Sequence, residues 1–221
     1  MYKYISENLP GVQFMDSEHN MCCACMDVGN NYSLFVVADY VPAKEANGMT
    51  AAGIVRLFTD GAYPQLFEQI FSDDADSGTE YFLPIFDYIS EKIAGERGSD
   101  RHKNPAVSCM VVEKSTLKAR FAGRGKTHMI IFDRFAREYE TAWPRFQGVT
   151  SMWGFIQLHS GCNILLANDT MFHLLYNNRT RRLYKIYEEM MFSELDQPFN
   201  LKALGDIAYI AADLNLWDSV Q

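Results

Sequence analysis

The sequence predicts an α+β fold in which two antiparallel sheets are covered by helices on their outer faces. The chain has 221 residues, which suits one compact domain with a substantial core. Its composition, 48% hydrophobic and 14% aromatic, excludes global disorder. Strand-like runs alternate with helical segments, in the order strands, helices, strands, helices and a last strand. That order is typical of a layered α+β domain. Without a repeat or linker, we expect residues 1–221 to form one domain.

The first two strands are expected at 21–28 (MCCACMDV) and 33–39 (SLFVVAD), two apolar runs rich in residues that favour strands. Gly29, Asn30 and Asn31 lie between them and are typical turn residues. A hairpin is therefore predicted here.

Helical spacing of apolar residues follows at 49–72 and again at 79–95. Gly61 and Pro64 interrupt the first of these segments, since both residues disfavour a helix interior. The polar stretch 96–105 has the composition of a loop.

In the second half of the chain, several predicted strands are followed by a predicted helical segment and a last strand. Residues 134–152, rich in arginine and aromatic residues, are predicted to form a loop with at most one helical turn, and 170–195 has a helical pattern. The strands are expected at 106–113, 117–123, 127–133, 154–158, 163–168 and 206–214.

Charge and cysteine content narrow the class of partner and the compartment. The 20 Lys and Arg residues against 28 Asp and Glu give a net charge of −8. This charge argues against binding to nucleic acid and is compatible with binding to a divalent cation or a basic partner. We see no signal peptide and no apolar run long enough for a membrane helix, so no membrane is expected. Five cysteines, an odd number, fit a reducing compartment, and a cytoplasmic location is predicted.

Two sequence features have a structural and a chemical interpretation. Cys22, Cys23 and Cys25 with His19 could bind a metal, but the spacing is wrong for a zinc site, and buried strand cysteines are favoured. The run 123–127 (GRGKT) lacks the spacing of a phosphate-binding loop, so a hairpin turn with glycine at positive φ is predicted.

Four motifs in order resemble those of the PP2C (PPM-type) metal-dependent serine/threonine phosphatase family. The resemblance covers roughly residues 11–214, and the order and spacing of the motifs carry it. The segments are LFVVAD at 34–39, AGRGK at 122–126, GCNILLANDT at 161–170 and GDIAYIAADL at 205–214.

The resemblance implies a four-layer αββα sandwich: two antiparallel sheets flanked by helix pairs. An active family member holds two or more Mg²⁺ or Mn²⁺ ions at one end of the sandwich, and a water bridging them attacks phosphorus. Asp39 matches the metal-bridging aspartate, and Asp169 matches the aspartate of the family's SDG motif. Asp206 is the third candidate ligand, if the closing motif is shifted by one residue.

Other positions depart from the family pattern. Tyr40 and Thr170 replace the glycines that follow the two matched aspartates, and Gly205 replaces the closing metal-binding aspartate. Arg124 replaces the aspartate of the GDSR motif, with Lys126 close behind, and we expect its charge to oppose a nearby cation. No Lys or Arg lies between Lys3 and Lys44, so that segment offers no phosphate clamp.

These departures favour a PP2C-like pseudophosphatase, a non-catalytic domain that binds or regulates a protein partner. The partner would be phosphorylated or a component of a kinase pathway. Asp39 and Asp169 would then be strand-end residues that cap following helices. The alternatives are a divergent Mg²⁺/Mn²⁺-dependent phosphatase using Asp39, Asp169 and Asp206, and a structural subunit of a larger assembly. No cofactor is expected, other than Mg²⁺ or Mn²⁺ if the residual site binds.

Overall fold

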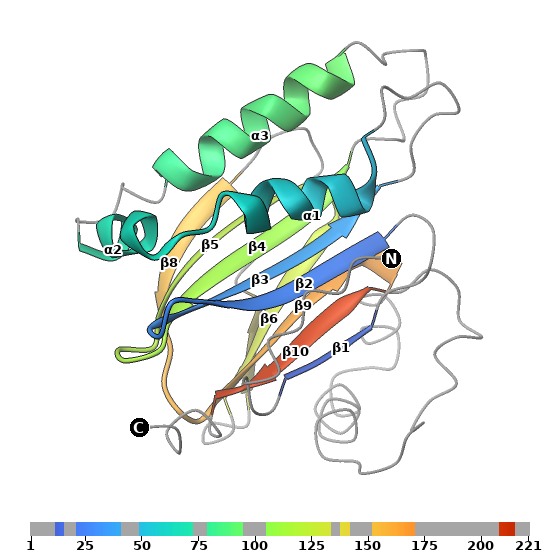
Figure 1. Ribbon diagram of the computed structural model, residues 1–221. Coiled ribbons are helices and arrows are strands. Elements are labelled where there is room, and N and C mark those ends of the chain that lie inside the picture. Colours follow the sequence, from blue (N-terminus) through green and yellow to red (C-terminus); the bar gives the residue numbers. More distant parts are fainter. Residues whose placement is uncertain are drawn as a thin grey trace.

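Two five-stranded antiparallel sheets form the framework of the protein (Figure 1). The computed structural model describes residues 12–15, 21–40, 49–72, 79–94, 105–133, 138–141, 152–170 and 208–214. The first sheet has the order β2-β3-β4-β5-β8 and the second the order β1-β10-β9-β6-β7. The strands are β1 (Val12–Met15), β2 (Met21–Val28), β3 (Tyr32–Asp39), β4 (Ala106–Glu113), β5 (Lys118–Arg124), β6 (Thr127–Asp133), β7 (Glu138–Thr141), β8 (Met152–Gln157), β9 (Cys162–Asn168) and β10 (Tyr209–Asp213).

Alternation along the central strands gives each sheet an apolar face toward the other. On β3, Phe35 and Val37 point between the sheets, where they join Met110 of β4 and Leu166 of β9 in one buried cluster. The intervening residues of β3 belong to the opposite face, as the period of two in a strand requires. Strands β3 and β9 therefore lie in the two halves of one core, and both end near the same place.

Three helices cover the other face of the first sheet, as Figure 1 shows. They are α1 (Ala51–Asp60), α2 (Pro64–Ser72) and α3 (Thr79–Ala94). The Thr50 hydroxyl caps α1 by accepting a hydrogen bond from the Gly53 N–H at 3.0 Å. Phe58, Phe67, Phe82 and Phe86 are almost fully buried between these helices and the sheet. None of the helices in the described ranges is long and apolar enough to cross a membrane.

Most predicted elements of the described segments are confirmed, including the β2–β3 hairpin and the break of the 49–72 segment into α1 and α2. Two strands differ from the prediction. No strand was expected at β1, and β7 lies within 134–152, where a loop was predicted. Both are four-residue strands at the margin of the second sheet, too short for a pattern to indicate them, and pairing with β10 and β6 defines them. The predicted helical segment 170–195 lies outside the described residues, apart from Thr170.

The connection between β5 and β6 corrects a second expectation. The predicted hairpin is wrong, because β5 pairs with β4 and β8 while β6 pairs with β7 and β9 in the other sheet. The chain crosses between sheets within two residues, Gly125 and Lys126, and Gly125 has the predicted positive φ of 73°. Both sides of β5 are already paired along its length, so β6 has no free edge there to pair with.

Candidate functional site

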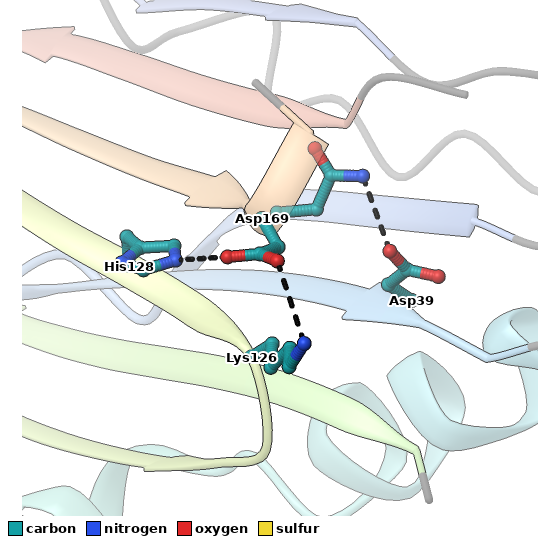
Figure 2. Close-up of polar contacts among 5 residues, drawn as sticks. Asp39, Lys126, His128 and Asp169 are labelled. Carbon is teal, nitrogen blue, oxygen red and sulfur yellow. Dashed lines mark hydrogen bonds and ion pairs between the residues drawn. The ribbon is translucent and has the colours of Figure 1, made fainter. Parts of the chain in front are cut away.

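The matched aspartates lie at one end of the sandwich, where β3 and β9 finish. Asp39 is the last residue of β3, and Asp169 directly follows β9. The buried runs that precede them, 34–38 and 162–168, hold these ends in the two sheets. Sequences 130 residues apart are thereby brought together, and Figure 2 shows the polar contacts that result.

Asp39 is bound by a side chain of the opposite sheet. The Asn168 amide donates a hydrogen bond from Nδ2 to Asp39 Oδ2 at 3.1 Å. Asn168 is itself fully buried, and its Oδ1 accepts a hydrogen bond from the Ala208 N–H at 3.2 Å. The backbone N–H of Asn168 donates to Ala208 O at 3.0 Å. Asn168 was not singled out in the sequence analysis as a site residue; its place at the end of the buried run, directly before Asp169, was the available signal.

Asp169 is contacted by two basic side chains from β6 and the turn before it (Figure 2). His128 Nε2 lies 2.8 Å from Asp169 Oδ1, and Lys126 Nζ lies 4.0 Å from Oδ2. Because a carboxylate oxygen only accepts, this hydrogen bond assigns a proton to Nε2 of His128. The His128 side chain is 8% exposed and that of Lys126 is 74% exposed. Asp169 therefore contacts one buried and one solvent-exposed basic side chain. Sequence reasoning noted Lys126 but missed His128.

The residues that replace the two family glycines differ in environment. Tyr40 is buried, with 2% exposure, in the core cluster beneath the helices. Thr170, in contrast, is exposed. Gly205 and Asp206 lie outside the described residues, as does His19.

Arg124 does not lie beside the two carboxylates as predicted. Its Nη1 donates to Phe86 O at 3.3 Å and to the hydroxyl of Ser90, both on α3. The reason is strand alternation: Ala122, two residues earlier on β5, already faces the helical layer, and Arg124 points the same way. Burial lowers the pKa of the Arg124 guanidinium from its usual range, and the negative charge of Asp87 opposes this shift. The guanidinium therefore links the sheet to α3.

This placement predicts that Arg124→Met and Arg124→Ala differ in stability. Arg124 is 3% exposed and its Nε has no hydrogen-bond partner, so methionine keeps the packing while removing a partly unsatisfied charge. In urea unfolding, we expect the free energy of unfolding of Arg124→Met to lie within about 1 kcal/mol of the wild-type value. We expect that of Arg124→Ala to be about 2–3 kcal/mol lower. Equal losses in both variants would show instead that the guanidinium bonds outweigh the packing of the stem.

The cysteines are structural in the described residues. Cys22, Cys23, Cys25, Cys109 and Cys162 are all buried and none of them is in a disulfide, which confirms the prediction of buried strand cysteines. Burial raises the pKa of the Cys25 and Cys109 thiols above the usual range. Thiolate chemistry at these positions is disfavoured.

The contacts at the site can be tested against the needs of a divalent cation. Mg²⁺ and Mn²⁺ require carboxylate, carbonyl or water oxygens directed at one point. Here an amide N–H group faces Asp39, and an imidazole and an ammonium group face Asp169. Within the described ranges no three His, Cys, Asp or Glu side chains converge as a candidate ligand group. The described residues, in this arrangement, do not fit a divalent cation.

Comparisons with known proteins show what the fold is. No protein-family model matches the sequence, and no curated protein matches it. Solved structures do match. A C. elegans sex determining protein has a TM-score of 0.62 at 10% identity over 94% of this chain, which spans only 66% of that protein. The S. agalactiae serine/threonine phosphatase has a TM-score of 0.60 at 14% identity, covering 90% of this chain and 97% of that one.

A third similar structure is RsbX in complex with magnesium, with a TM-score of 0.53 at 11% identity over 90% of this chain and 92% of that one. At identities this low, the similarity shows a shared fold. The chain has the α+β fold of the PP2C-type protein phosphatases, the class that its motif order indicated.

Proposed function

We propose that this protein is a PP2C-like pseudophosphatase, a non-catalytic domain that acts by binding a protein partner in a phosphorylation pathway. The observation that carries the proposal is the occupation of both matched carboxylates by N–H donors of the chain itself. Asp39 faces the Asn168 amide at 3.1 Å, and Asp169 faces His128 at 2.8 Å.

The local charges support this proposal. Lys126 Nζ, 4.0 Å from Asp169 Oδ2, already supplies a positive charge at the place where a cation would have to approach. A divalent ion entering there would be repelled by the ammonium group, or would have to displace it together with the His128 hydrogen bond. The buried Tyr40, where the family has glycine, removes the backbone freedom of that position.

The architecture and the similar structures support a role in signalling. The phosphatase domain of SpoIIE, described as a cell fate determinant from Bacillus subtilis, has a TM-score of 0.51 at 11% identity. We propose a protein partner of the same kind of pathway, either phosphorylated or part of its kinase machinery. We further propose a single domain with the four-layer αββα sandwich that the resemblance implies.

The proposal predicts the outcome of a Mn²⁺ titration. Calorimetry up to millimolar Mn²⁺ should give no saturable binding, and phosphoester hydrolysis should stay at the level of a blank. The variants Asp39→Ala and Asp169→Ala should behave like wild type in both assays. Metal-dependent turnover that both substitutions abolish would contradict the proposal and identify a divergent Mg²⁺/Mn²⁺-dependent phosphatase.

The partner is tested separately from catalysis. A pull-down should recover a partner whose binding changes when the partner is treated with an unrelated phosphatase. A stable complex that is insensitive to phosphorylation would instead favour a structural subunit of a larger assembly.

A further inference from the structure

We infer that Asn168 is a built-in bridge between the two sheets, which occupies with an amide the place where a PP2C-type site would hold a cation. This inference deepens the proposed function and rests on it for its biological meaning. The bridge consists of the hydrogen bond from Asn168 Nδ2, at the end of β9, to Asp39 Oδ2, at the end of β3. It joins residues 129 apart in sequence and one strand end of each sheet.

The orientation of the Asn168 amide is determined by its second partner. Ala208 N–H donates to Oδ1 at 3.2 Å, and an N–H can only meet the oxygen side of the amide. The NH₂ group must then face the Asp39 carboxylate. The reciprocal bond from the Asn168 N–H to Ala208 O extends the β9–β10 ladder by one residue and holds the side chain in place.

Burial makes this contact matter for stability. Asn168 has no exposed surface, so its amide cannot exchange the Asp39 hydrogen bond for one to bulk water. A hydrogen bond to a charged acceptor in such a place is stronger than one between neutral groups. Residue-by-residue comparison with the motif SDG places Asn168 at the serine, and a serine hydroxyl is too short to span the same gap.

The bridge is tested first by a double-mutant cycle on the full chain, in EDTA so that no metal contributes. Asp39→Ala and Asn168→Ala should each lower the thermal midpoint by about 4–8 °C. The double variant should lose clearly less than the sum of the two, because the hydrogen bond between the two side chains is already lost in each single variant and is counted twice in the sum. Additive losses would show that the two side chains do not interact and would overturn the inference. Asn168→Ala also removes the hydrogen bond from the Ala208 N–H. This loss is the same in the wild-type and in the Asp39→Ala background, so it cancels from the coupling energy of the cycle.

A second measurement tests whether the Asn168 amide occupies the position beside Asp39 that a cation would take. Asn168→Asp should lower the midpoint in EDTA, since it places a second carboxylate against Asp39, and 1 mM Mn²⁺ should restore several degrees of that loss. The matched control, Asp39→Ala combined with Asn168→Asp, should lack this response. No response in Asn168→Asp would overturn the inference. A rise of the wild-type thermal midpoint in Mn²⁺ would contradict the proposed function. The double-mutant cycle in EDTA would still test whether Asn168 and Asp39 interact.

Discussion

Replacing Phe58 with alanine should lower the free energy of unfolding by about 4 kcal/mol, the largest loss we expect from a single substitution. Phe58 lies on α1 with no exposed surface. Its ring packs edge-on against Tyr81, 6.3 Å between centroids, and Phe86, 5.8 Å away, both on α3. Its removal leaves a cavity at the point where α1, α3 and the first sheet meet, and rigid neighbours on three sides prevent the cavity from closing. Urea unfolding with two spectroscopic probes measures the change.

Tyr81→Phe provides the matched control for that experiment. It keeps the ring and removes only the hydroxyl, which donates a 2.6 Å hydrogen bond to Phe58 O. The expected loss is about 1 kcal/mol, the net value of one such bond. If Phe58→Ala cost no more than Tyr81→Phe, the helical layer would be far less tightly packed than its buried aromatic rings indicate.

Gly125→Ala is expected to destabilise the protein by about 3 kcal/mol, because two unfavourable effects coincide at one residue. Its φ of 73° is in the left-handed region that disfavours side chains, and an added Cβ would lie 2.8 Å from Ala106 Cα. The atom it meets belongs to the backbone of β4 and cannot rotate away. The turn that carries the chain from one sheet to the other would have to shift, and Lys126 with it. Chemical unfolding measures the loss.

Two controls isolate the backbone contact at Gly125. Gly29 also has a positive φ, 64°, but a Cβ there would meet only the Pro64 side chain, with Cγ at 3.0 Å, so Gly29→Ala should cost about 1–2 kcal/mol. Lys126→Ala changes an exposed neighbour and should stay within about 0.5 kcal/mol. A loss at Gly125 no larger than at Gly29 would mean that φ alone matters at both turns.

The helices and most strands of the described part of the chain were predictable, because their signals are local. The alternation in β3 and β4 and the helical spacing in α1 and α3 each lie within one segment. The strands β1 and β7 carried no such signal, since four residues are too few and pairing with a neighbouring strand defines them.

The sequence by itself determined the α+β class, the positions of Asp39 and Asp169 at the ends of buried runs, and the resemblance that makes these residues candidates. Only the tertiary structure decided what surrounds them. Arg124 turned out to face α3, because its direction depends on which face of β5 the helices cover. Asn168 and His128 reach the aspartates because the two sheets pack with β3 over β9 and β6 pairs with β9. The first contact joins residues 129 apart in sequence and the second joins residues 41 apart. Both depend on sheet order and on packing between strands, which no local sequence pattern indicates.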